Sequence, residues 1–342
     1  MSRGLINRRR ALLYAIVVFL LLSVISFMLY NNMRGRNDVI RNPKKVVIAY
    51  VNNLHSALVL VAVKKGYFKD QGLDVVLLPQ YLGKTALEIV LAGNADIATV
   101  TETPIMFNIL KGKKIYVLSS IQNSDKENVI ITLKDRISSV KNFKGKTIAV
   151  SKGTTGEYFA YLFCLLYGIK PTDVNFIDRK IETMIELLIT GEADAVSTSQ
   201  PYAYFILRKL SDRVKVFYGE GIYSATFYIA ARQEFVQSNP EIVEGVLSAL
   251  YRAEQYINKE PAISQEIIAE SCNLNMVLVQ ELWGLYNSEL TLDQSLVSSL
   301  ENETQWAIEG GKVNNTEVPD YLDYVYVNGL KKIKPHAITI IE

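Results

Sequence analysis

The sequence has few of the residues that bind metals. Its 342 residues include two cysteines, Cys164 and Cys272, and two histidines, His55 and His336. These four form no CxxC, HExxH or Cys/His cluster, which excludes a zinc site of soft ligands, so we expect no metal and no cofactor. Cys164 lies in an apolar run and is interpreted as a small buried residue. The sequence leaves a Cys164–Cys272 disulfide open.

An excess of one charge is also lacking, because 37 Lys and Arg residues oppose 35 Asp and Glu residues. The balance is uneven along the chain, however. Residues 1–45 hold nine bases and one acid, a net charge of +8, which leaves residues 46–342 with 28 bases, 34 acids and a net charge of −6. An acidic body lacks the clustered Lys and Arg that neutralise phosphates, so we expect no nucleic-acid partner.

One stretch lacks charge altogether: residues 11–30 read ALLYAIVVFLLLSVISFMLY. As a helix these twenty residues would span about 30 Å, the hydrocarbon thickness of a bilayer. Arginines at 8–10 precede the run, which places a basic leader, residues 1–10, in the cytoplasm and the body outside it. The length of the run and its poor cleavage site favour an uncleaved transmembrane anchor over a cleaved signal, the open alternative. Residues 31–45 are polar and are interpreted as a linker.

From Val46 onward, short apolar runs of strand length alternate with helical patterns. Such alternation predicts an α/β fold with a mostly parallel sheet and helices on both of its faces. Strands buried on both faces are expected to be continuous apolar runs, as these are. The predicted strands are 46–50, 74–78 and 97–100, and the predicted helices are 56–65, 84–92 and 104–111.

The body also repeats itself. Residues 89–98 (IVLAGNADIA) align with residues 187–196 (LLITGEADAV), and residues 45–49 (KVVIA) resemble 146–150 (KTIAV) at a similar offset. In each copy a helix ends at glycine, a turn contains Ala-Asp, and a buried strand leads to a polar loop. The repeat predicts two similar lobes, and a ligand would bind between them, at the loops that follow the carboxyl ends of the strands.

Two strand-like runs, 128–133 and 225–230, are placed to carry the chain from one lobe to the other and back. We therefore expect the first lobe to comprise residues 46–131 and 222–342, and the second to comprise residues 132–221. Helices that pack around the first lobe are predicted over 240–258, 262–271, 274–286 and 293–310.

Several motifs, taken in order, resemble those of a known family. They are the segment KGYFKDQGLDV at 65–75, the Gly-x-x-Asp turns at 93–96 and 191–194, the segment VKNFKGKTIAV at 140–150, and the FVQSNP segment at 235–240 that precedes a long helix. This pattern resembles the nitrate/sulfonate/taurine-type substrate-binding proteins of ABC importers, which share their fold with binding proteins for pyrimidine precursors of thiamine.

The resemblance implies a type II periplasmic-binding-protein fold, a two-lobed "Venus flytrap" that closes on a small molecule by bending at its hinge. It also implies an ABC permease and its ATPase as partners. The sequence departs from the family pattern at Gln200-Pro201, where Glu-Pro is frequent, and in having an apolar run where relatives carry a lipid-bearing cysteine.

Four loops and one tyrosine near the returning hinge are the candidate ligand-binding site. The candidates are Asn52, Asn53 and His55; Thr99, Thr101 and Glu102; Ser151, Gly153, Thr154 and Thr155; Gln200 and Tyr202; and Tyr223. The glycines and the helix start at 151–156 favour an anion, and Glu102 is the carboxylate expected near an amine. His55 is equally interpreted as a structural residue, and Glu102 as a solvated residue of the rim. The two charged subsites would suit a zwitterion such as an aminosulfonate.

Three functions fit these expectations to different degrees. Capture of a solute for import is the leading interpretation, and a membrane-tethered sensor that uses the same cleft is the alternative. An enzyme related to pyrimidine synthases of this fold is disfavoured, because no Cys/His or Ser/His/Asp arrangement is present and the body is expected outside the cytoplasm.

Overall fold

The computed structural model describes residues 43–219, 221–314 and 316–341. The apolar run at 11–30 and nearly all of the linker lie outside these residues. Among the residues that are described, no helix is both long enough and apolar enough to cross a membrane.

The first of two sheets consists of β1 (Lys44–Val51), β2 (Leu73–Gln80), β3 (Ile97–Thr101), β4 (Ile115–Ser124) and β10 (Ala225–Arg232). Their order is β2-β1-β3-β10-β4. Strand β1 runs parallel to β2 and β3, whereas β10 runs antiparallel to β3 and β4. Strand β3 is buried along its whole length, as expected for an apolar run covered by helices on both faces.

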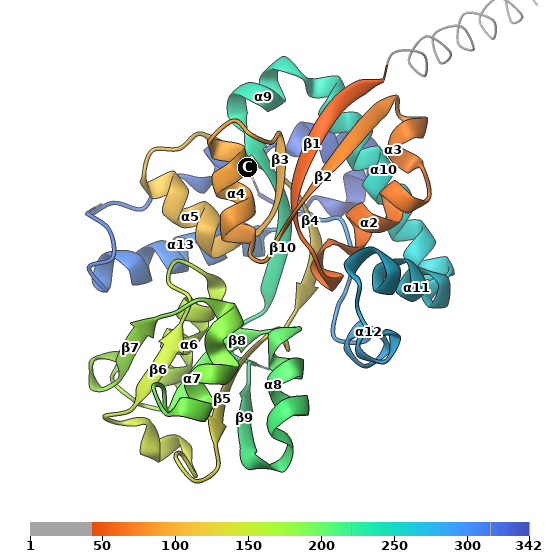
Figure 1. Ribbon diagram of the computed structural model, residues 1–342. Coiled ribbons are helices and arrows are strands. Elements are labelled where there is room, and N and C mark those ends of the chain that lie inside the picture. Colours follow the sequence, from red (N-terminus) through yellow and green to blue (C-terminus); the bar gives the residue numbers. More distant parts are fainter. Residues whose placement is uncertain (1–42, 220, 315, 342) are drawn as a thin grey trace, which may run out of the picture.

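The second sheet consists of β5 (Asn128–Leu133), β6 (Thr147–Val150), β7 (Asn175–Asp178), β8 (Ala195–Ser199) and β9 (Val214–Tyr218). Their order is β7-β6-β8-β5-β9, with β6 parallel to β7 and β8, and β5 antiparallel to β8 and β9. Each sheet with its helices is called a lobe below. Figure 1 shows the second lobe below the first, joined to it by two crossings of the chain.

The two sheets confirm the internal repeat. Their strand orders correspond position by position, and each contains one reversed strand, β10 or β5. In the first lobe Asp96 Oδ2 accepts the backbone N–H of Val47 at 2.8 Å, and in the second lobe Asp194 Oδ2 accepts that of Thr147 at 2.9 Å. The aspartate of each Ala-Asp turn therefore fastens the turn to the first strand of its own sheet.

The chain crosses to the second lobe through residues 125–127 and returns between β9 and β10. Strands β5 and β10 were both expected to cross between the lobes, but β5 belongs wholly to the second sheet and β10 wholly to the first. The boundary expected at 131–132 therefore falls inside β5. Strand β4 was not predicted, because its serines interrupt the apolar pattern. The Ser120 hydroxyl donates to Glu289 O and accepts from Thr291 N, both at 2.8 Å, so the polar residues of β4 bind the C-terminal segment.

Helices cover both faces of each sheet (Figure 1). Those between the strands are α2 (Ala57–Lys64), α3 (Tyr67–Asp70), α4 (Gly83–Leu91), α5 (Glu102–Leu110), α6 (Thr155–Leu166), α7 (Met184–Thr190) and α8 (Tyr202–Leu210). After β10 follow α9 (Gln233–Ser238), α10 (Pro240–Lys259), α11 (Pro261–Cys272), α12 (Met276–Trp283), α13 (Gln294–Glu309) and α14 (Val327–Ile333).

The longest of these helices, α10, shows why the C-terminal segment packs on the first lobe. Pro240 occupies its first turn, where a missing N–H costs no hydrogen bond. Ile242, Val243, Val246 and Leu250 are buried and recur at helical spacing, so they form one apolar face. This face joins the core of the first lobe, as predicted for the C-terminal helices.

Both cysteines are free thiols, so the open alternative of a disulfide is resolved. Cys164 is fully buried in α6, as predicted, and burial raises the pKa of its thiol to about 11. Cys272 ends α11, and burial raises the pKa of its thiol to about 12.

Candidate functional site

A narrow cavity of about 40 Å³ lies between the lobes, where the carboxyl ends of the parallel strands of both sheets meet. Most of its polar lining consists of hydroxyl groups. The first lobe and the outgoing crossing contribute Leu82, Gly83, Lys84, Thr101, Pro104, Glu127 and Phe227. The second lobe contributes Asn128, Ser151, Thr154, Thr155, Gly156, Ile181, Ser197, Thr198 and Ser199.

Eight of the thirteen candidate residues line the openings between the lobes. Thr101, Ser151, Thr154 and Thr155 line the narrow cavity, which we call the central cleft. Asn52, Asn53 and Tyr202 line a wider opening of about 420 Å³ on the side of α8 and α11. A third opening, of about 490 Å³, lies on the side of α5 and α6 and includes Gly153 in its wall.

Three further candidates lie nearby but bind other parts of the protein. Thr99 Oγ1 accepts the backbone N–H of Val51 at 2.9 Å, so it fastens β3 to β1. Gln200 Oε1 accepts the backbone N–H of Tyr204 at 3.1 Å, within the first turn of α8. His55 is 2% exposed and lies behind the cleft. None of these three side chains lines a described cavity.

Glu102 and Tyr223 bind each other instead of facing the cleft. Glu102 begins α5 immediately after β3 and is 1% exposed, and its Oε1 accepts a hydrogen bond from the Tyr223 hydroxyl. Glu303 of α13 lies on the other side of that hydroxyl, at 3.2 Å. Burial raises the pKa of Glu102 to about 7, and burial followed by the charge of Glu102 raises the pKa of Glu303 well above its usual range. The sequence left open that Glu102 is a solvated residue of the rim, and its burial excludes this alternative.

The start of α6 forms the floor of the central cleft. Gly153 has a φ of +72°, which favours glycine, and Thr154 Oγ1 donates to Ser151 O at 2.6 Å. The Gly153 N–H donates at 2.7 Å to the Glu157 carboxylate, so a residue of the protein already occupies part of this helix terminus. Thr154 and Thr155 still face the cleft there.

Buried polar groups without a partner gather around the central cleft. Both atoms of the Asn128 amide and the Thr198 hydroxyl are buried, line the cleft and make no hydrogen bond to any described residue. Both atoms of the Gln122 amide are also unpartnered, and Gln122 pairs in register with Phe227, which lines the cleft. Such groups are rare in proteins, because each costs about 1–3 kcal/mol when left unpaired.

Glu127, which lines the cleft, makes a buried contact with His55. His55 Nε2 is 2.9 Å from Glu127 Oε2, although the described residues offer neither ring nitrogen a well-aligned hydrogen bond. The imidazole stacks on Phe227 at 4.2 Å between ring centroids and meets the edge of Tyr286 at 5.4 Å. The Tyr286 hydroxyl donates to Glu127 Oε2 at 3.1 Å. Glu127 thus connects the outgoing crossing to the first lobe.

Gly83 and Lys84 are residues of the cleft that the sequence analysis missed. They begin α4, and a Cβ on Gly83 would lie 2.8 Å from the Cα of Val100, so only glycine allows this close approach. Lys84 Nζ donates to Lys152 O at 2.9 Å across the cleft. Ligand-binding loops were expected to follow the carboxyl ends of strands, and residues 81–84 satisfy this rule because they follow β2.

Side-chain contacts hold the lobes together on both sides of the cleft. On one side Lys312, after α13, is 2.6 Å from Glu157 of α6. On the other side Arg208 of α8 pairs with Glu281 of α12. Figure 1 places α13 beside α6 and α12 beside α8, at opposite edges of the view. Contacts between the lobes are therefore present on both sides of the central cleft.

Comparison with known proteins gives a family and several relatives. A model of the family described as "NMT1/THI5 like" matches residues 53–264. A binding protein of Brucella abortus is 24% identical over 220 residues, which cover 63% of this chain and 67% of that protein. A Bacillus subtilis protein named for binding aliphatic sulfonates is 25% identical over 201 residues, which cover 57% of this chain and 60% of that protein.

Solved structures show the same fold. The periplasmic aliphatic sulphonate binding protein SsuA from Escherichia coli matches with a TM-score of 0.71 and 17% identity, over 84% of this chain and 98% of SsuA. The periplasmic nitrate-binding protein NrtA from Synechocystis PCC 6803 matches with a TM-score of 0.68 and 13% identity, over 86% and 89%. The two-lobed periplasmic-binding-protein fold is thus confirmed, and these relatives and structures are all named as binding proteins.

Proposed function

The chain belongs to the NMT1/THI5-like family, and on that premise we propose that it is an extracytoplasmic solute-binding protein of an ABC importer. In this proposal a small anionic or zwitterionic organic molecule binds between the lobes. An ABC permease and its ATPase then receive the molecule from the closed protein. The names of the relatives, which refer to aliphatic sulfonates and nitrate, support an anionic solute.

One observation carries the proposal: the unpartnered amide of Asn128 and hydroxyl of Thr198 face the central cleft. A polar solute held between the lobes would complete the hydrogen bonds of these two side chains. A packed structural interface would bury apolar groups or paired polar groups at this position.

The lining of the cleft suggests how an anion would bind. Thr155 presents a hydroxyl at the start of α6, where the helix dipole favours negative charge, and Lys84 lies across the cleft. The hydroxyls of Ser151 and Thr154 also line the cleft, but they donate to Arg179 O and Ser151 O and would have to turn to meet an anion. A positively charged group of a zwitterion would meet Glu127, because Glu127 lines the cleft and Glu102 does not. The openings beside the cleft bring Asn52, Asn53 and Tyr202 to the edge of the same site.

Binding requires the lobes to part. The central cleft holds about 40 Å³, close to the roughly 30 Å³ that one water occupies in the liquid, whereas ligand pockets typically measure roughly 300–1,000 Å³. We propose that the lobes, bounded by the crossings at 125–127 and between β9 and β10, separate as rigid units. The Lys84–Lys152, Lys312–Glu157 and Arg208–Glu281 contacts would break on opening and re-form around the solute.

We further propose that residues 11–30 anchor the protein in the cytoplasmic membrane, with the lobes on the outer face. Cell fractionation tests this part, together with the mass of the mature N-terminus. An intact N-terminus that resists an alkaline wash of the membranes would support the anchor. A mature chain that lacks these residues would show a cleaved signal instead.

A thermal-shift screen of the purified protein tests solute binding. The panel comprises aliphatic sulfonates, taurine, nitrate, amino acids and pyrimidines, and a bound solute raises the melting temperature by mass action. We expect a sulfonate or a related anion to stabilise the protein, and Asn128→Ala or Thr198→Val to abolish that shift. Glu270→Gln, on the exposed surface of α11, is the matched control and should bind like the wild type. Stabilisation that survives both cleft variants would refute the site, and turnover of a bound compound would favour an enzyme.

A further inference from the structure

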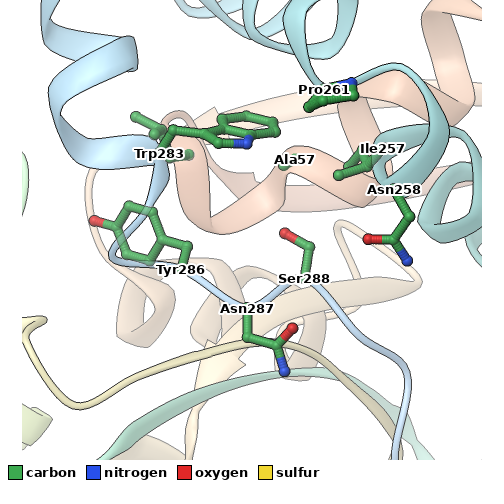
Figure 2. Close-up of a pocket in the computed structure, with 9 residues that line it drawn as sticks. Ala57, Ile257, Asn258, Pro261, Trp283, Tyr286, Asn287 and Ser288 are labelled. Carbon is green, nitrogen blue, oxygen red and sulfur yellow. The ribbon is translucent and has the colours of Figure 1, made fainter.

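A separate cavity of about 180 Å³ lies within the first lobe. Three segments that are distant in the sequence line it and leave it open to solvent on one side: residues 54–57 at the start of α2, residues 257–261 between α10 and α11, and residues 283–288 at the end of α12. Figure 2 shows the Trp283 ring covering the space and the Ser288 hydroxyl pointing into it. No residue of the central cleft lines this cavity, so the two sites are distinct.

The lining of this cavity selects against charge. None of the lining residues is acidic or basic; Leu54, Ala57, Ile257 and the ring of Trp283 form the apolar part of the wall, and polar groups form the larger part of its surface. Three groups can hydrogen-bond to a guest: the Ser288 hydroxyl, the Asn258 amide and the Trp283 N–H. None of these three makes a side-chain hydrogen bond to another residue that the structure describes. A charged guest would find no partner for an ion pair in this lining.

The wall of the cavity is fastened to the crossing between the lobes. Asn287 and Asn123, near the end of β4, exchange two backbone hydrogen bonds of 3.0 Å. The neighbouring Tyr286 also lines the cavity, and its hydroxyl donates to Glu127 on the crossing. A guest that displaces residues 286–288 would therefore displace the outgoing crossing as well.

We propose that this cavity is a second binding site, for a small neutral molecule with a single ring and one hydrogen-bonding group, and that its occupancy is transmitted to the crossing at 125–127. The volume supports this class, because about 150 Å³ is enough space for benzene, and the additional space suits a hydroxyl beside Ser288. The ring would lie against Trp283, and its hydroxyl would face the polar side of the cavity.

Phenol tests the site, because its hydroxyl ionises near pH 10 and the molecule is neutral at pH 7. The chain has only two tryptophans, so the full-length Trp306→Phe variant reports on Trp283 alone. We expect phenol to change its fluorescence in a saturable manner, with a dissociation constant on the order of 1 mM. Benzoate, a charged ring of similar size, should have no saturable effect. The matched Trp283→Phe variant, which reports on Trp306, should not respond to phenol.

Filling the cavity should abolish this response. Ala57→Leu places a larger side chain in the wall and should weaken phenol binding roughly tenfold or more. Ser288→Leu provides a second blocked variant, and circular dichroism verifies that each variant folds. Undiminished binding in a folded blocked variant, or an equal response to benzoate, would overturn the assignment of this site.

Amide hydrogen exchange tests the transmission and does not depend on the proposed solute. Saturating phenol should slow exchange in residues 119–129 at least roughly twofold in the Trp306→Phe protein. Adding Tyr286→Phe removes the hydroxyl that binds Glu127 but keeps the ring, so phenol should still bind while this protection is largely lost. Phenol that binds without changing exchange in residues 119–129 would overturn the coupling.

Discussion

The buried carboxyl groups of Glu102 and Glu303 should make the protein less stable as the pH rises. The two side chains are 1% and 0% exposed, and both lie beside the hydroxyl of Tyr223. Within the part of the chain that the structure describes, no Lys, Arg or His pairs with either of them. Burial without a cation favours the protonated form of both groups.

The pKa of Glu102 sets the magnitude. Burial raises this pKa from 4.5 to about 7, so the folded protein holds the proton more tightly than the unfolded chain does. The contribution of Glu102 to the free energy of unfolding is most favourable below pH 4.5 and is lost as the pH rises through 7. At about 1.4 kcal/mol per pKa unit, ionisation of Glu102 should lower the free energy of unfolding by about 2.5 kcal/mol between pH 5 and pH 8. Glu102→Gln keeps the shape of the side chain but cannot ionise.

Urea unfolding at several pH values between 5 and 8, followed by circular dichroism, measures this effect. We expect the free energy of unfolding of the wild type to fall more steeply with pH than that of Glu102→Gln, by about 2.5 kcal/mol over this range. Glu270→Gln, which neutralises an exposed carboxylate, should keep the slope of the wild type. Equal slopes for the wild type and Glu102→Gln would refute the reasoning.

Three other substitutions should reduce stability by separate mechanisms. Gly83→Ala places a Cβ 2.8 Å from a backbone Cα of β3 and should cost about 1–3 kcal/mol in urea unfolding, whereas Gly284→Ala, where nothing lies within 4 Å, should be nearly neutral. Asp194→Ala removes the acceptor for the backbone N–H of Thr147 in β6. Hydrogen exchange of that amide should accelerate, and the free energy of unfolding should fall by about 1–2 kcal/mol. Lys334→Met leaves the buried Glu254 carboxylate without the ammonium 2.8 Å away, and should cost about 3 kcal/mol at neutral pH and less in acid.

The strands and the repeat were predictable because their signals are local. Continuous apolar runs marked β1 and β3, and the two Ala-Asp turns marked the ends of equivalent helices. The expectation that ligands bind at the carboxyl ends of parallel strands placed Thr101, the last residue of β3, and Thr154, which follows β6, at the cleft.

Two cleft residues that the sequence did not reveal, Asn128 and Phe227, lie on strands whose direction the sequence does not show. Asn128 is the first residue of β5, and Phe227 lies near the start of β10. Both strands run antiparallel to their neighbours, so their amino ends lie where the carboxyl ends of the others do. Selecting only the loops that follow strands could not find them. Glu102 was expected near an amine, and the sequence could not show that it lies beside Glu303 instead. Glu303 is 201 positions later in the chain, on α13, and no local pattern reveals how α13 packs.

The double crossing of the chain has a consequence for how the protein folds during synthesis. All five strands of the second sheet lie between residues 128 and 218, so this sheet can form as soon as that stretch has been translated. The first sheet cannot, because its fourth position is filled by β10, in which Phe227 pairs with Thr101. Until β10 arrives, β3 and β4 lack their shared partner, and the apolar faces destined for the C-terminal helices stay exposed. The lobe that is begun first is therefore completed last, and it is the lobe that needs protection from aggregation while the ribosome finishes the chain.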